Sequence, residues 1–211
     1  MTLVFDGPKT GPLFVFAHGA GAPLSSAFME LVSKGLAEQG IRVARFNFHY
    51  MQQRIECGHR RPPERAPQLV KQFGELIQQI DQPMVIGGKS MGGRIATLLA
   101  AEKALPFISY IKGIACLGYP FHPQGKPEQL RVEHLSDIDL PLAIIQGARD
   151  KLGCNEEVRG YALPETIQWC WLEDGDHDFK PRIKSGFTHE QHINTCIRYL
   201  ASYIKTCHQV N

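Results

Sequence analysis

The chain has 211 residues, of which 43% are hydrophobic and 21% charged, with 20 glycines and 14 prolines. These values are typical of a globular protein with its own core, and they exclude collagen, a coiled coil, a disordered chain and a disulfide-stabilised miniprotein. The formal net charge of +2 is too small to predict binding to nucleic acid or to a membrane surface. We expect a single domain over residues 1–211.

The cysteines and the first residues indicate a cellular compartment. The opening residues MTLVFDGP contain no basic segment followed by an apolar core, so we expect no secretory signal. The six cysteines form no C-x-x-C pair, and Cys116 and Cys170 fall within apolar runs that predict buried thiols. Reduced cysteines without a signal are typical of the cytoplasm, which is the expected localisation.

In the first half of the chain, short apolar runs alternate with helical patterns. Strands are expected over residues 2–5, 13–17, 41–48 and 83–87. Helices are expected over residues 26–39, around the spaced apolar residues Val70, Phe73, Ile77 and Ile80, and over residues 91–103. Residues 49–67 are rich in Arg, His and Pro and are expected to form a loop.

The second half continues the alternation. Strands are expected over residues 113–117, 142–146 and 167–172, a loop over 119–129 and a short helix over 130–138. The last helix begins at Thr188, where Thr188 and Gln191 match a capping box. Strands that alternate with helices predict a mostly parallel sheet with helices on both faces, a three-layer α/β fold. Sites in such folds lie beyond the carboxyl ends of the strands.

A nucleophile-elbow pattern follows the strand at 83–87. Gly88-x-Ser90-x-Gly92 lies between an apolar strand and an Ala-rich helix, as G-x-S-x-G does in hydrolases that present Ser on a sharp turn. Gly88-Lys89-Ser90 also resembles the end of a nucleotide-binding P-loop, but that motif requires Gly at position 83, which is Pro. We therefore interpret Lys89 as the variable residue of the elbow.

Two further turns complete a catalytic pattern. Asp150 follows the strand at 142–146, and His177 follows the strand at 167–172. Ser90, Asp150 and His177 therefore occur in the chain order of α/β-hydrolase triads. Asp176 is an alternative acid.

Three other histidines compete with His177 for a place in the predicted site. We expect His18 to be structural, and His189 and His192 to be surface or packing residues of the last helix. The small residues that follow His18 suit an oxyanion hole, with backbone N–H groups from Ala20 and Met91.

These motifs resemble those of the α/β-hydrolase superfamily, and more narrowly a small, capless dienelactone-hydrolase-like family related to testis-expressed and NSL-complex-subunit hydrolase-like proteins. The resemblance spans nearly the whole chain. It rests on HGAG at 18–21, RFNFHYM at 45–51, GKSMGG at 88–93, LGYPFHP at 117–123, GARD at 147–150 and GDH at 175–177. It implies an α/β-hydrolase fold without a large cap domain.

The motifs predict a serine hydrolase that cleaves an ester, thioester or related acyl bond of a small molecule, with no metal or organic cofactor. A serine peptidase with the same triad and a non-catalytic interaction module on the same fold remain alternatives. Two loops are expected to select the substrate. In the loop 119–129, Tyr119 and Phe121 are candidates for an acyl pocket. The loop 49–67 collects the basic residues Arg54, His59, Arg60, Arg61 and Arg65, of which Arg54 is the candidate ligand for an anionic group.

Overall fold

A computed structural model describes residues 1–102 and 105–209. Its described strands form one sheet in the order β1-β3-β2-β4-β5-β6-β7, in which only the pairing of β1 with β3 is antiparallel. The strands are β1 (Leu3–Asp6), β2 (Leu13–Ala17), β3 (Arg42–Phe46), β4 (Met84–Lys89), β5 (Ile111–Leu117), β6 (Leu142–Gly147) and β7 (Gln168–Leu172). The predicted α/β-hydrolase fold with a mostly parallel sheet is confirmed.

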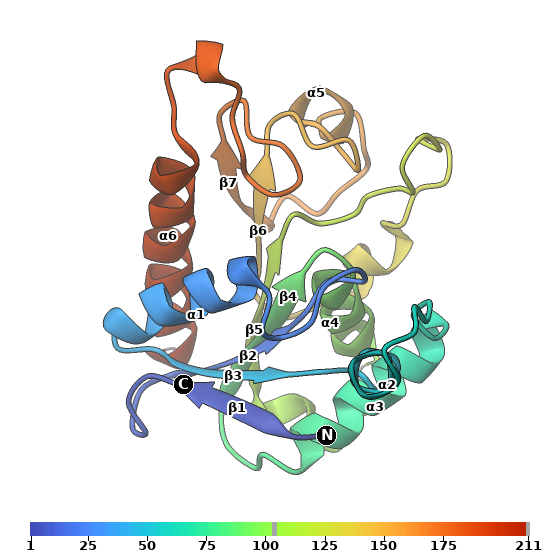
Figure 1. Cartoon of the computed structure of the whole chain (residues 1–211), viewed down its shortest axis with the longest axis vertical. Coiled ribbons are helices and arrows are strands. Elements are labelled where there is room, and N and C mark those ends of the chain that lie inside the picture. The colour runs from blue at the N-terminus through green and yellow to red at the C-terminus, as the bar shows by residue number, and fades with distance from the viewer. Residues whose placement is uncertain (103–104, 210–211) are drawn as a thin grey trace.

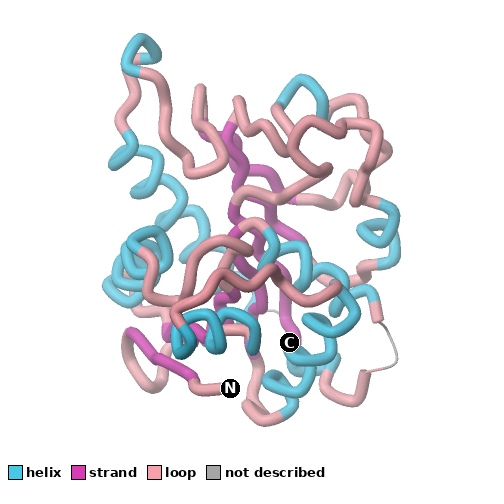
Figure 2. The backbone as a smooth tube through the Cα atoms, turned by 45° about the vertical axis from the view of Figure 1, so that its right-hand side comes forward, coloured by secondary structure: helices cyan, strands magenta, loops and turns pink. Residues whose placement is uncertain are grey.

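Helices cover both faces of this sheet (Figures 1 and 2). The α-helices are α1 (Ala27–Glu38), α2 (His49–Cys57), α3 (Ala66–Gln78), α4 (Met91–Ala101), α5 (Asn155–Val158) and α6 (His189–Gln209). Short 3₁₀ helices are η1 (Ile108–Tyr110), η2 (Glu133–Asp137) and η3 (Ile183–Ser185). In Figure 1, α1 and α6 lie on one side of the sheet and α2, α3 and α4 on the other. In the part of the chain that the structure describes, no large cap covers the strand ends, as predicted.

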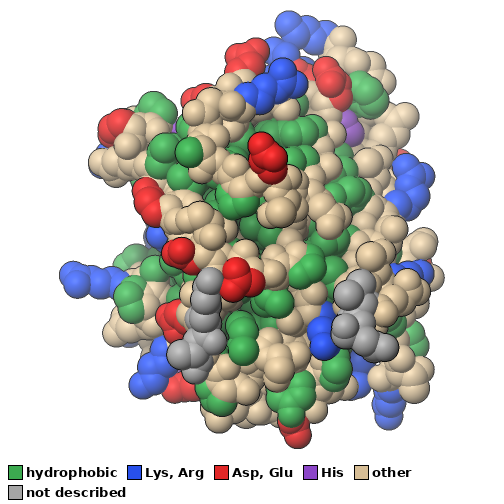
Figure 3. Space-filling model, turned by 180° about the vertical axis from the view of Figure 1, so that it is seen from behind, with side chains coloured by type: hydrophobic (Ala, Val, Ile, Leu, Met, Phe, Trp, Pro, Cys, Tyr) green, Lys and Arg blue, Asp and Glu red, His purple; other side chains and the backbone are tan. Residues whose placement is uncertain are grey.

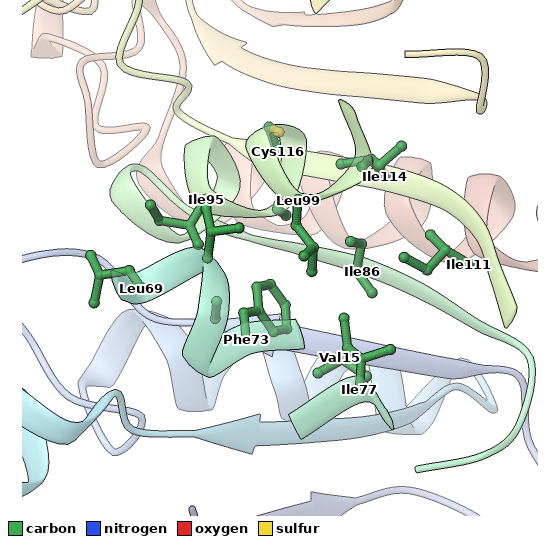
Figure 4. Packing of buried hydrophobic residues seen from close by; sticks show 14 of the residues in the cluster. Val15, Leu69, Phe73, Ile77, Ile86, Ile95, Leu99, Ile111, Ile114 and Cys116 are labelled. Carbon is green, nitrogen blue, oxygen red and sulfur yellow. The ribbon is translucent and has the colours of Figure 1, made fainter. Parts of the chain in front are cut away.

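The two faces of the sheet bury separate apolar clusters. On one face, α1 and α6 contribute residues such as Leu36 and Leu200, which pack against the sheet. On the other, α3 and α4 pack against the strands, and Figure 4 shows Phe73 and Leu99 meeting Val15 and Ile86 there. The central strands β2 and β4 are buried along their whole length, as expected when helices cover both faces.

Two predicted elements differ from the structure, and one predicted boundary is not tested by it. The predicted loop 49–67 contains α2, because the side chains of Tyr50 and Met51 bury into the core and hold one face of a short helix. Gly58 ends α2 in the left-handed region at φ +69°. The predicted helix at 130–138 is only the 3₁₀ turn η2. The predicted end of α4 at residue 103 lies outside the described residues.

The distribution of charges on the surface agrees with the near-neutral composition, and the burial of two cysteines agrees with their apolar sequence surroundings. Seen from behind, hydrophobic side chains gather in the middle of the surface, and both acidic and basic side chains lie around them (Figure 3). Cys116 is buried and Cys170 half-buried, and burial raises the pKa of the Cys170 thiol to about 11. Within the described residues, no helix has the length and apolar character needed to cross a membrane.

Candidate active site

Ser90 occupies a sharp turn between β4 and α4. Its backbone has φ 50° and ψ −114°, a conformation that costs a non-glycine residue on the order of 1–3 kcal/mol and is typical of functional turns. The Ser90 N–H donates to the Leu117 carbonyl oxygen at 2.9 Å, which fixes the turn to β5. A Cβ on Gly88 would lie 2.5 Å from the backbone carbon of Gly92, so this crossing requires glycine. The strand-turn-helix expected around Ser90 is therefore present.

Asp150 and His177 meet beyond the ends of β6 and β7. The Nδ1 atom of His177 lies 2.7 Å from Oδ2 of Asp150, and the Asp150 side chain is fully buried. The other oxygen, Oδ1, accepts the Leu152 N–H at 2.9 Å. Because a buried carboxylate held by several donors stays fixed, Asp150 can orient the imidazole and hold its tautomer.

The alternative acid, Asp176, has a different role. Its Oδ1 accepts the backbone N–H groups of Asp178 and Lys180, each at 2.9 Å. These bonds shape the turn that carries His177. The structure thus places Asp150 against the imidazole and Asp176 against the backbone.

Gln146 is a supporting residue that the sequence analysis missed. This last-but-one residue of β6 is fully buried, and its Nε2 donates to Asp150 Oδ2 at 3.0 Å and to the Gly153 carbonyl at 3.1 Å. Its Oε1 accepts the Tyr119 N–H at 2.7 Å. The only signal in the sequence is a polar residue at the end of an otherwise apolar strand. Gln146 therefore anchors the acid and joins its turn to the loop after β5.

The predicted oxyanion donors lie on either side of Ser90. Met91 is the first residue of α4, so its N–H is one of the first N–H groups of the helix, which have no hydrogen-bond partner within it. Ala20 follows β2 and lines two cavities together with Ser90. Its carbonyl oxygen accepts the Tyr50 hydroxyl at 3.0 Å, which holds this loop against α2. The positive end of the α4 dipole favours negative charge at the same place.

His18 holds the same loop from its other end. Its buried Nε2 accepts the Phe48 N–H at 3.1 Å, and its Nδ1 lies 2.7 Å from the Gly19 carbonyl oxygen. An acceptor at Nε2 and a donor at Nδ1 require the neutral ring. Burial lowers the pKa of His18 to about 4, which agrees with that assignment. His18 therefore has the structural place that its loop position predicts.

Two cavities open beside Ser90. The first, of about 560 Å³, lies between the loop after β2, the start of α1 and the His177 turn. It is lined by Gly19, Ala20, Gly21, Ala22, Ser26, Ala27, Phe28, Met29, Leu31, Lys89, Ser90, His177, Asp178, Lys180 and His189. The second, of about 360 Å³, lies on the α3 side, where Pro63 and Pro120 contribute from the two predicted specificity loops. Ser90 lines both cavities.

The candidate substrate residues do not line these cavities. Tyr119 and Phe121 are fully buried, so the predicted acyl pocket is not built from their rings. The chain turns at Gly118, which has φ +67°, and the Tyr119 hydroxyl then donates to the Arg131 carbonyl at 2.8 Å. Arg54 is half-buried and lines neither cavity, and its Nη1 donates to the Gly21 carbonyl at 3.3 Å.

The histidines of α6 differ from each other. His189 lines the first cavity, and its Nε2 lies 3.0 Å from the Asp178 carbonyl oxygen. His192 is buried, with Nδ1 2.9 Å from the Phe179 carbonyl oxygen. Among the residues that the structure describes, no group of three or more His, Cys, Asp and Glu side chains is placed to bind a metal ion.

Comparison with known proteins identifies the family. A sequence profile of the alpha/beta hydrolase domain matches residues 10–205. The chain belongs to the α/β-hydrolase family. Its fold is similar to that of a serine hydrolase homologue from Coxiella burnetii, with 13% identity and a TM-score of 0.68 over 95% of this chain and 90% of that one.

Two further solved structures have the same fold. A monoacylglycerol lipase from Paleococcus ferrophilus has 14% identity and a TM-score of 0.68 over 95% of this chain and 98% of its own. A dienelactone hydrolase from Anabaena variabilis has 16% identity and a TM-score of 0.66 over 97% and 91%. The predicted superfamily is therefore confirmed.

Proposed function

We propose that this protein is a serine hydrolase that cleaves an ester, thioester or related acyl bond of a small molecule through Ser90, His177 and Asp150. The observation that carries the proposal is the 2.7 Å contact between His177 Nδ1 and the buried Asp150, with His177 lining the same cavity as Ser90. The names of the similar structures, which include a lipase, a thioesterase domain and a dienelactone hydrolase, support a hydrolase.

The chemistry follows from the roles of the three side chains. His177 Nε2 takes the proton of Ser90 as its oxygen attacks the acyl carbon, and Asp150 stabilises the imidazolium through Nδ1. The imidazolium then gives that proton to the departing oxygen or sulfur, which leaves an acyl group on Ser90. Water, deprotonated by His177, releases the acid and restores the serine. The Met91 and Ala20 N–H groups bind the oxyanion in both steps, and losing one such donor costs about 10²–10³ in rate.

A covalent probe tests the nucleophile without knowledge of the substrate. A fluorophosphonate reacts with an activated serine, so we expect it to label the wild type and not Ser90→Ala. Ser202→Ala, an exposed serine of α6, is the matched control and should be labelled like the wild type. Melting curves of all three proteins check that the variants are folded.

The alternatives predict other outcomes. A folded wild type that the probe does not label would overturn the proposal and favour the interaction module. Labelling that survives in Ser90→Ala would assign the nucleophile to another residue. Cleavage of peptide amides but not of esters or thioesters would favour the peptidase.

A further inference from the structure

Lys89 is buried at the centre of the site, although lysine is among the residues least often buried. It is the last residue of β4 and directly precedes Ser90, and its side chain is only 9% exposed. Removing an ammonium group from water costs several kcal/mol unless partners compensate. The motif alone predicts a variable position at Lys89, but the burial of this side chain requires a specific set of contacts.

The contacts of Lys89 lead to the histidine turn. Its Nζ donates to the backbone carbonyl of His177 at 2.6 Å and lies 3.6 Å from Oδ1 of Asp178. It also lies over the rings of Phe28 and Phe179, 5.4 and 5.9 Å from their centroids. One side chain therefore joins the nucleophile strand to the backbone that carries the base.

Lys89 also lies close to the imidazole ring. A Cβ built on Gly118 would be 3.1 Å from Lys89 Nζ and 3.3 Å from His177 Nδ1, so both atoms border the same small space. Gly118 leaves that space open because it has no side chain. The ammonium is thus near enough to the ring for a direct electrostatic effect.

We propose that Lys89 is a positioning residue that fixes the His177 turn relative to Ser90 and holds its ammonium group beside the imidazole ring. The inference rests on the proposed function, because it treats His177 as the general base. Lys89 acts through the His177 backbone and through its charge.

Several charged groups surround this pair. Those facing Lys89 and His177 from the neighbouring turns and helix are Asp150, Asp176, Asp178, Lys180 and His189. Burial lowers the pKa of Lys89, and Asp178, Asp150 and Asp176 oppose that effect. Replacing Lys89 by a neutral residue removes a cation near the ring and leaves Asp178 unpaired. Both changes make the surroundings of the imidazole ring more negative, so activity should be lost at a higher pH on the acid side.

The test compares Lys89→Met, Lys89→Arg and Lys205→Met. Methionine keeps most of the apolar stem against Phe28 and Phe179, and Lys205, an exposed lysine of α6, is the matched control. The readout is the second-order rate constant for fluorophosphonate labelling of Ser90 between pH 5 and 9. Because a displacement of about 1 Å can cost 10²-fold, we expect Lys89→Met to label about 10- to 100-fold more slowly at pH 7. Its acid limb should move up by about 0.5–1 pH unit.

The arginine variant distinguishes charge from packing. Lys89→Arg keeps the charge, so its acid limb should stay with the wild type, while its longer side chain leaves a reduced rate. A folded Lys89→Met with an unchanged rate would overturn the proposal, and so would a reduced rate with an unmoved acid limb, which indicates a merely structural role.

A second variant keeps the test valid if Lys89→Met fails to fold. Asp178→Asn removes the ionic partner of Lys89 while keeping its side chain nearly the same size. Because a nearby negative charge is lost, its acid limb should move down, opposite to that of Lys89→Met. An unmoved limb would overturn the inference. A wild type that is never labelled would overturn the proposed function together with the role of Lys89. A wild type that is labelled, with one of the contrary results above in the variants, would overturn only the role of Lys89.

Discussion

The buried His18 predicts a specific loss of stability in acid. Its pKa is lowered to about 4 in the folded protein by burial, against about 6.5 in an unfolded chain. Between these values the unfolded chain binds a proton and the folded protein does not, so the free energy of unfolding falls as the pH is lowered through this window. The difference between pH 8 and pH 5 is about 2 kcal/mol for this one group. Burial keeps water from the charged ring, and a protonated Nε2 would also point its hydrogen at the Phe48 N–H.

Urea unfolding of wild type and His18→Gln at pH 5, 6 and 8 measures this loss. The glutamine oxygen can accept the Phe48 N–H, but the side chain does not titrate. All other groups, including the half-buried His134, are present in both proteins and cancel in the comparison. We expect the wild type to lose about 2 kcal/mol more than the variant between pH 8 and pH 5. Equal losses in the two proteins would refute the reasoning, because they would place the titrating group elsewhere.

Two further predictions test the acid and the loop after β5. Asp150→Asn should keep the fold and slow the labelling of Ser90 by about 10³–10⁴-fold, because an amide favours the wrong tautomer of His177. Asp176→Asn should slow the labelling far less. If Asp176→Asn slowed it more than Asp150→Asn, the acid would be Asp176. Tyr119→Phe loses the hydrogen bond to the Arg131 carbonyl, so it should lower the free energy of unfolding by about 1 kcal/mol in urea titrations. The labelling of Ser90 should not change, because the Tyr119 ring lines neither cavity. A loss of labelling with unchanged stability would instead place Tyr119 in the site.

The sequence predicts the sheet and the turns of the candidate site well for a simple physical reason. The central strands are buried on both faces, so they are nearly continuous apolar runs that end where a turn residue appears. In a parallel sheet these ends lie at one edge, so chain order alone brings the turns of Ser90, Asp150 and His177 together.

The sequence does not predict where the side chains of irregular segments point. Tyr119 follows a strand like the other site residues, but the positive φ of Gly118 turns its ring into the core. In α2, only Tyr50 and Met51 bury, too few to give a helical period in a segment dominated by polar residues. Lys89 was missed for a related reason: its burial depends on a carbonyl and a carboxylate 88 and 89 positions later in the chain.

The two cavities change where substrate selection should be sought. The larger cavity lies against the start of α1, where Phe28 and Leu31 form part of the wall, and neither predicted specificity loop lines it. Those loops meet Ser90 only at the smaller cavity. In the proposed reaction, an acyl substrate divides at Ser90 into an acyl part and a leaving group. Because Ser90 lines two cavities, one cavity can hold the acyl part and the other the leaving group. Specificity for the two parts would then depend on different segments of the chain. Since the described residues contain no cap domain, the short segment between β2 and α1 takes the place of a lid in shaping the larger cavity.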